Sequence, residues 1–263
     1  RNIYAPRGIA VDSIFDHLVQ RGVPHRVYSY HSFRDEEILE QARRDLERRT
    51  TGFFFLYLSE MDRFLHHHCD TDAPFDERLD WYARGLGKVF DAARAVDPAA
   101  EFTVISDHGM TPVRHVGNLV GEVERLGLTM PGEYLAVYDS TMARFWFSTD
   151  EVRRRVEDRL RAVPYGRILA DDELERLGIL FPDRRYGELV FLLEPGWLIG
   201  GSDFNGRGWA PAGMHGYHPD DAYSDGIFLS SRRPATEVKS LLDIHPLMVA
   251  AAQAAARSEA SPA

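Results

Sequence analysis

The sequence is poor in lysine and in cysteine, and its net charge is negative. Of the 31 lysines and arginines only Lys88 and Lys239 are lysine, which leaves 29 arginines; we attribute this bias to genomic base composition. The net charge of -10 argues against the basic face of a protein that binds a nucleic-acid polymer. Cys69 is the single cysteine, so an intrachain disulfide is impossible. This favours a reducing compartment, and we expect a cytoplasmic location.

Long apolar runs and a recognisable leader are also lacking. No run approaches the about 18 apolar residues of a membrane-spanning helix, so no membrane segment is visible. The chain begins at Arg1 without a methionine or a signal-like segment, and the loss of a leader together with further sequence stays open. What is present is an ordinary globular composition, since 263 residues with 44% hydrophobic content supply a normal core. The sequence does not indicate an oligomeric state.

Strand-like and helix-like segments alternate along the chain. Several of the strand-like runs are almost uninterrupted in apolar residues, which is typical of strands covered on both faces. The alternation predicts the α/β class, with a layered sheet and helices on both faces. The expected strands cover residues 25–30, 52–58, 101–106, 144–147, 188–193 and 226–230, and the expected helices cover residues 11–21, 35–48, 75–96, 119–126, 151–162 and 235–256.

The segment 129–195 differs from its surroundings in its residue patterns. It contains helix, strand and turn signals but none of the ligand-like residue patterns found on either side. We interpret it as a small α+β insertion or cap that shapes access to a site. Residues 1–128 and 196–257 then form one main α/β domain, and residues 258–263 form a frayed tail.

The stretch VISDHGM places Asp107 and His108 side by side at the end of an apolar run. Neighbouring side chains on a strand point to opposite faces, so these two converge on one point only if the strand has already ended. The pattern therefore predicts a site at the carboxyl end of a strand, the edge where open α/β sheets place their ligands.

A second pattern follows the strand-like run GFFFLYL. Asp62 and His66 are four residues apart, so a helix that begins near Asp62 brings both side chains to one face, about one turn apart. A carboxylate and an imidazole at this spacing can share a cation. His67 and His68 point elsewhere on such a helix, and we interpret them as structural or supporting residues.

A third pattern lies in the glycine-rich loop from residue 201 to residue 216. Ordering His215 between Gly213 and Gly216 costs conformational entropy, and metal ligation would supply a reason for it. Taken alone, the segment fits an exposed turn equally well. His218 has the weaker case as a ligand.

Together the three patterns predict a centre for two divalent cations, with ligands of the type that zinc accepts. Asp62, His66 and His215 form one nitrogen and oxygen set with an open fourth position, and Asp107 with His108 forms half of a second set. Two cations about 4 Å apart would hold the attacking and leaving oxygens of an in-line phosphoryl displacement.

The same patterns resemble the alkaline phosphatase superfamily, and within it the type I phosphodiesterase and nucleotide pyrophosphatase family. The matching residues are EMDRFLH at 60–66, SDHGM at 106–110 and GMHGYHP at 213–219. The resemblance extends from about Ile14 to Leu229. It implies an alkaline-phosphatase-like layered sheet, one zinc on Asp62, His66 and His215, and a second zinc on the pair Asp107 and His108. It also implies hydrolysis of a small phosphodiester or nucleotide pyrophosphate.

One departure from the family concerns the nucleophile. The family begins with a strand that ends in a further metal-binding Asp, followed by a Thr or Ser nucleophile at a helix N-terminus. Here Thr50 and Thr51 precede a strand, Asp12 with Ser13 is typical of a helix cap, and we find no Ser or Thr that follows a strand into a helix. We therefore expect a fragment that lacks the nucleophile and one ligand, binds one zinc tightly, and is inactive alone.

Two alternatives stay open at this point. The same scaffold could act as a phosphomonoesterase, a phosphonate hydrolase or a phosphomutase, or the chain could be a non-catalytic metal-binding homologue. Substrate-contacting residues are unknown: Arg114 and His115 follow the stretch VISDHGM closely, but they fit solvated loop residues better.

Overall fold

The chain folds into two compact units, here called unit 1 and unit 2. The structure is a computed structural model that describes residues 2–48, 52–204 and 208–259. Unit 1 comprises residues 1–63, 73–107 and 227–263, and unit 2 comprises residues 64–72 and 108–226. Helix α3 (Glu60–His68) begins in unit 1 and ends in unit 2.

Unit 1 combines short strands with long helices. Strands β1 and β2 pair in parallel, with Tyr28 opposite Leu56, whereas β3 and β12 pair in antiparallel fashion, with Val104 opposite Leu229. Its elements are α1 (Ile14–Gln20), β1 (His25–Tyr28), α2 (Asp35–Glu47), β2 (Phe53–Leu56), α4 (Asp72–Val96, whose first residue belongs to unit 2), β3 (Thr103–Ile105), β12 (Phe228–Ser230), a 3-10 turn (Leu241–Asp243) and α8 (Ile244–Glu259).

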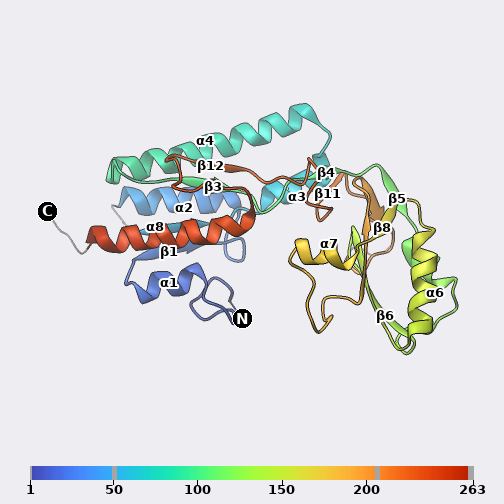
Figure 1. Ribbon diagram of the computed structural model, residues 1–263. Coiled ribbons are helices and arrows are strands. Elements are labelled where there is room, and N and C mark those ends of the chain that lie inside the picture. Colours follow the sequence, from blue (N-terminus) through green and yellow to red (C-terminus); the bar gives the residue numbers. More distant parts are fainter. Residues whose placement is uncertain (1, 49–51, 205–207, 260–263) are drawn as a thin grey trace. The chain divides into compact units, whose positions relative to one another are not determined.

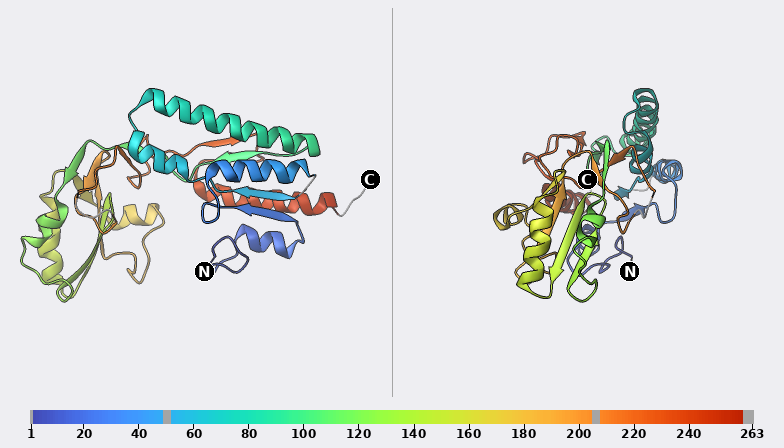
Figure 2. Two further views of the ribbon diagram at one scale, coloured as in Figure 1. Left: turned by 180° about the vertical axis from the view of Figure 1, so that it is seen from behind. Right: turned by 90° about the vertical axis from the view of Figure 1, so that its right-hand side faces the viewer.

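Strand β2 shows why unit 1 is layered. Its sequence FFFL alternates between two faces, as the period of a strand requires. Phe53 and Phe55 pack with buried residues of α1 and α8, while Phe54 and Leu56 pack with buried residues of α2 and α4. The left view of Figure 2 shows these helices on the two sides of the strands. The prediction that this apolar run is covered on both faces is confirmed.

The predicted start of the first helix is also explained by the structure. Ser13, one of the two residues expected to cap it, accepts a hydrogen bond from the backbone N–H of Asp16, and the Asp16 carboxylate accepts one from the backbone N–H of Ser13. This is a capping box. Hydrogen bonds from Ser13 and Arg7 hold the pKa of Asp16 below its usual value. After the helix comes Gly22, whose positive φ of 66° suits a residue without a Cβ.

Unit 2 is built around a four-stranded antiparallel sheet in the order β6-β7-β9-β8. Two further strand pairs lie in this unit: β10 with β5 in parallel, and β11 with β4 in antiparallel fashion. The elements are β4 (Thr111–Pro112), β5 (His115–Gly117), α5 (Leu119–Glu124), β6 (Tyr134–Tyr138), β7 (Met142–Phe147), α6 (Asp150–Arg161), β8 (Gly166–Ile168), α7 (Asp171–Arg176), β9 (Leu189–Leu193), β10 (Trp197–Ile199) and β11 (Gly213–Met214).

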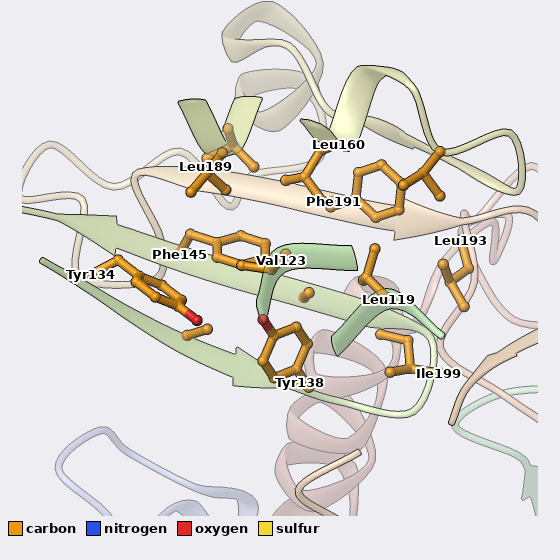
Figure 3. Close-up of a cluster of buried hydrophobic side chains, with 14 of the residues drawn as sticks. Leu119, Val123, Tyr134, Tyr138, Phe145, Leu160, Leu189, Phe191, Leu193 and Ile199 are labelled. Carbon is orange, nitrogen blue, oxygen red and sulfur yellow. The ribbon is translucent and has the colours of Figure 1, made fainter. Parts of the chain in front are cut away.

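The largest buried cluster lies on one face of this sheet (Figure 3). Phe145 of β7 and Phe191 of β9 are fully buried there, together with Leu160 of α6 and Val123 of α5. The other face packs Val190 and Leu192 against α7 and the segment that follows it. All five residues of β9 are buried, so its uninterrupted apolar sequence has a direct structural reason.

The structure differs from the predicted boundaries at the C-terminal end of the chain. The expected helix 235–256 is wrong in its first nine residues, because α8 begins only at Ile244, after a 3-10 turn capped by Ser240. Pro246 gives the reason: a proline is tolerated in the first turn of a helix but breaks its interior.

The predicted insertion 129–195 lies within unit 2, and its role as a separate cap stays a prediction. Of the expected tail, residues 258 and 259 continue α8, and residues 260–263 lie outside the described part of the chain.

Candidate metal centre

Three histidines from three separate segments gather within unit 2. His66 comes from the last turn of α3, His108 lies three residues after the end of β3, and His215 directly follows β11. The ring centroids of His66 and His215 are 5.3 Å apart, and the rings of His108 and His215 stack at 3.8 Å with an angle of 18° between their planes. Ring nitrogens of His108 and His215 lie within 4.8 Å of each other. Imidazole is a common ligand of divalent metals, so three imidazoles at these distances fit a metal centre.

Backbone carbonyls set the tautomer of two of these rings. Nδ1 of His66 lies 2.8 Å from the carbonyl oxygen of Gly213, and Nδ1 of His108 lies 2.8 Å from the carbonyl oxygen of Gly109. A carbonyl only accepts, so each Nδ1 must carry the hydrogen and donate it. Nε2 is then the ring nitrogen with the lone pair. This is the pattern in which metal-binding histidines are held, so the residues fit a metal site on their own chemistry.

The segment that carries His215 is fixed on both sides. Before it, Met214 of β11 pairs with Thr111 of β4, and the N–H of Ala212 donates to the carbonyl of His66 at 2.8 Å. After it, the buried Thr141 hydroxyl donates to the carbonyl of Gly216 at 2.6 Å. His215 therefore sits in an ordered segment, and the exposed-turn alternative for this part of the loop is wrong.

Gly216 itself has a conformation that favours glycine. Its φ is +89°, and a Cβ at this position would lie 3.1 Å from the Thr141 hydroxyl oxygen. Both facts disfavour any side chain next to His215. The earlier loop residues 205–207 lie outside the described part of the chain.

The two predicted carboxylates belong to unit 1. Asp62 lies in the first turn of α3, and Asp107 follows β3 by one residue, after Ser106. The pKa of the Tyr57 hydroxyl is raised first by burial and then by the charges of Asp107, Tyr30 and Asp62. Both carboxylates therefore lie near Tyr57. Unit 1 therefore carries both acidic residues near Tyr57, after the carboxyl ends of β2 and β3.

The remaining histidine candidates have other contacts. His68 stacks on Phe64 with ring centroids 4.7 Å apart, which agrees with a structural role. His218 lies 3.1 Å from Glu173 through Nε2, and its Nδ1 accepts from the backbone N–H of Asp220. His218 is thus engaged with α7.

The two residues considered for substrate contact are engaged as well. Arg114 forms an ion pair with Asp70, and this pair raises the pKa of the guanidinium. The ring of His115 lies 4.6 Å from that of Trp197, which in turn stacks on Tyr165. These contacts give both residues structural roles.

The statement that no Ser or Thr follows a strand into a helix is wrong. Ser59 lies between β2 and α3, and Thr149 lies between β7 and α6, where its hydroxyl caps the helix by accepting from the N–H of Val152. Both residues could have been found from the sequence, because Ser59 follows the predicted strand 52–58 and Thr149 lies between the predicted strand 144–147 and the predicted helix 151–162. Thr50 and Thr51, considered and rejected from the sequence, lie outside the described residues.

Sequence reasoning also missed residues that support the site. Thr141 is separated from Gly216 by 75 positions, and no spacing pattern links them. Tyr57 directly follows β2 and lies within the predicted strand 52–58, so it could have been noted there.

Among the described helices, none is long and apolar enough to cross a membrane.

The layered sheets with helices on both faces, together with the gathered histidines and the strand-end carboxylates, define an alkaline-phosphatase-like α/β protein. The family model of type I phosphodiesterase / nucleotide pyrophosphatase matches residues 10–218. The chain belongs to this family, and the resemblance seen in the three sequence patterns is confirmed. No curated protein sequence matches the chain.

Comparison with solved structures supports the fold class. Murine ectonucleotide pyrophosphatase/phosphodiesterase 5 is 20% identical with a TM-score of 0.65, over 82% of this chain and 62% of its own. The human protein of the same name is 17% identical with a TM-score of 0.70, over 91% of this chain and 70% of its own. Phosphonoacetate hydrolase from Sinorhizobium meliloti 1021 is 16% identical with a TM-score of 0.60, over 84% of this chain and 56% of its own. The predicted fold class is confirmed, and the chain spans less than two thirds of the murine protein's length.

Proposed function

We propose that this chain carries the two-metal centre of a hydrolase that acts on phosphodiesters or nucleotide pyrophosphates. Asp62, His66 and His215 would hold one divalent cation, and Asp107 with His108 would contribute to a second. The observation that carries the proposal is the gathering of His66, His108 and His215 in unit 2, with the tautomers of two of them set by backbone carbonyls.

The two carboxylates are close to His66 and His108 along the chain. Asp62 precedes His66 by one turn of α3, since both lie within Glu60–His68. Asp107 is bonded through its peptide group to His108. Each histidine of these two pairs therefore has an acidic partner at short range, which supports a mixed carboxylate and imidazole ligand set of the kind that zinc accepts. Zinc is the metal that we propose.

The bound cations, the imidazoles and the carboxylates would then have separate chemical roles. Bound cations would supply Lewis-acid stabilisation of the phosphoryl oxygens and of the developing charge on the leaving oxygen. His66 and His108 donate their Nδ1 hydrogens to the carbonyls of Gly213 and Gly109, which leaves Nε2 of each ring as the nitrogen that would bind a cation. Asp62 and Asp107 reduce the net positive charge of the centre. The nucleophile is not among these five residues.

A nucleotide is the proposed substrate class. The murine structural neighbour has been solved in complex with AMP, a phosphate ester of a nucleoside. A chain with a net charge of -10 would repel such an anion in the absence of bound cations. Recognition of the phosphate therefore depends on the metal centre in this proposal.

The test measures binding rather than turnover, because the nucleophile is unassigned. The chain is stripped with a chelator and titrated with zinc, and AMP binding is then measured calorimetrically with and without zinc. We expect one zinc bound tightly and a second more weakly, since a site with only two protein ligands loses much of its affinity. AMP is expected to bind only to the zinc-loaded chain. A chain that binds no zinc, or that binds AMP equally well without it, would contradict the proposal.

A second candidate function rests on the fold shared with phosphonoacetate hydrolase. That enzyme's structure contains phosphonoacetate, an anion with a carbon–phosphorus bond. In the same calorimetric experiment, phosphonoacetate that binds more tightly than AMP to the zinc-loaded chain would favour phosphonate hydrolysis. Tighter binding of AMP favours the nucleotide class.

Replacing Gly216 with alanine is expected to weaken zinc binding at His215. The new Cβ would press on the Thr141 hydroxyl at a backbone conformation that alanine rarely adopts, and so shift the segment next to His215. The control is Gly178→Ala, also in unit 2, which has a φ of +71° but open space around its Cβ. Both variants should lose about 1 kcal/mol of stability, and only Gly216→Ala should change zinc affinity. Equal zinc affinities in the two variants would show that this contact does not position His215.

A further inference from the structure

The most completely buried acidic side chain of unit 1 contacts the start of helix α3. Asp35, the first residue of α2, has no exposed surface. Its Oδ1 accepts a hydrogen bond from the backbone N–H of Ser59 at 3.0 Å, and its Oδ2 accepts one from the N–H of Glu60 at 3.0 Å. The hydroxyl of Tyr82, from α4, donates to Oδ2 as well. Three donors thus surround one buried carboxylate.

These bonds satisfy the helix terminus that needs them. The first turn of a helix leaves backbone N–H groups without partners inside the helix, and its positive end favours a negative charge. A buried carboxylate costs free energy unless donors surround it, so Asp35 is stable here because α3 supplies two of its three hydrogen bonds. Burial and the contact with Asp35 raise the pKa of Tyr82, which keeps its hydroxyl a donor.

Two ion pairs of Glu60 also hold the first turn of α3. The Glu60 carboxylate lies 3.1 Å from Arg34 of the segment before α2 and 3.1 Å from Arg78 of α4. The Arg78 guanidinium lies over the rings of Trp81 and Tyr82, at 5.1 and 5.2 Å from their centroids. The first turn of α3 is therefore fixed to α2 and α4 together. It is a nine-residue helix, too short to be stable without such contacts.

We propose that Asp35, assisted by Tyr82, is a positioning residue for the metal centre. By holding the N–H groups of Ser59 and Glu60 it fixes the start and rotation of α3, and hence the direction of Asp62 two residues later and of His66 one turn beyond. The proposal rests on the proposed metal-binding function. Residues that orient metal ligands indirectly contribute about 10- to 100-fold to metal affinity, which sets the size of the effect.

The chain offers a matched control on the same helix. Asp45 of α2 accepts a hydrogen bond from the hydroxyl of Tyr28 at 2.8 Å, so it forms a second Tyr–Asp pair in the core of unit 1. Neither Asp45 nor Tyr28 contacts α3 through any of the hydrogen bonds described for this part of the chain. The pairs Asp35→Asn with Asp45→Asn, and Tyr82→Phe with Tyr28→Phe, remove the same chemical groups at the two places.

The experiment measures zinc affinity by competition with a chelator, the visible spectrum of the cobalt(II)-substituted chain, and thermal stability. Asp35→Asn replaces one carboxylate oxygen with an NH₂ group that faces a backbone donor, so we expect a 10- to 100-fold loss of zinc affinity and a changed cobalt spectrum. Tyr82→Phe keeps both backbone bonds and should change both readouts in the same direction but less. Asp45→Asn and Tyr28→Phe should lower thermal stability and leave zinc affinity and the spectrum as in the wild type.

The outcomes separate the two proposals. A wild-type chain that binds no zinc contradicts the proposed function itself. If the wild type binds zinc but Asp35→Asn and Asp45→Asn have equal affinities and spectra, the positioning role of Asp35 is overturned. Should Asp35→Asn fail to fold, the comparison of Tyr82→Phe with Tyr28→Phe decides: equal zinc affinities and spectra overturn the role, and a selective loss in Tyr82→Phe supports it.

Discussion

His215→Ala is expected to lower the zinc affinity of the chain by more than about 100-fold. Loss of a residue that only orients a ligand already costs about 10- to 100-fold, and His215 is proposed to bind the cation directly. Its segment is also held by β11 and by the Thr141 hydroxyl, so the protein cannot easily bring a substitute ligand to the same place. Chelator competition on the purified variant, followed by metal analysis after gel filtration, measures the loss.

His218→Ala is the matched control, because it removes the same side chain three residues later. His218 contacts Glu173, and the pKa of that carboxyl is held below its usual value by Arg167 first and by His218 less strongly. We expect wild-type zinc affinity in this variant. The reverse result, normal binding in His215→Ala and weak binding in His218→Ala, would mean that the ligand was assigned to the wrong histidine of the loop.

Leu193→Ala is expected to lower the free energy of unfolding of unit 2 by about 2 to 5 kcal/mol, the range measured for leucines in well-packed cores. Leu193 ends β9 and has 2% of its surface exposed within the large cluster of unit 2 (Figure 3). Its backbone N–H donates to Thr141, the residue that holds Gly216. Urea denaturation followed by circular dichroism measures the change.

The control removes the same atoms from the same sheet. Leu135 lies on β6 with 53% of its surface exposed, so Leu135→Ala should change the free energy of unfolding by less than about 0.5 kcal/mol. Similar losses in the two variants would show that the cluster in unit 2 is not the core that stabilises the sheet. Because His66, His108 and His215 all belong to unit 2, unfolding of this unit would also separate them.

Some features could be predicted because their cause is local. The run FFFL has the period and composition of a covered strand, and it forms β2 with helices on both faces. Asp107 and His108 end an apolar run, and β3 ends two residues before Asp107. The family resemblance was equally local, since it rests on three short patterns, and the match over residues 10–218 confirms it.

Other features were missed because short elements carry little sequence signal. Strands β4, β8, β10 and β11 have two or three residues each, and their pairing partners decide that they are strands at all. Local preferences also placed the start of α3 near Asp62, two residues after its actual start at Glu60. Element ends are set by capping contacts, which for α3 come from Asp35, 24 and 25 positions away.

The sequence by itself determined the chemical types of the proposed ligands and the elements that carry them. Spacing of four on a helix, adjacency at a strand end and a glycine-rich loop are all local properties, readable without coordinates. Only the tertiary structure decided that His215 is ordered, that Gly213 and Gly109 set the imidazole tautomers, and that Asp35 holds the start of α3. The physical reason is that a hydrogen bond depends on distances of about 3 Å and on direction. The bond from His66 to Gly213 spans 147 positions, and no pattern along the chain specifies such a distance.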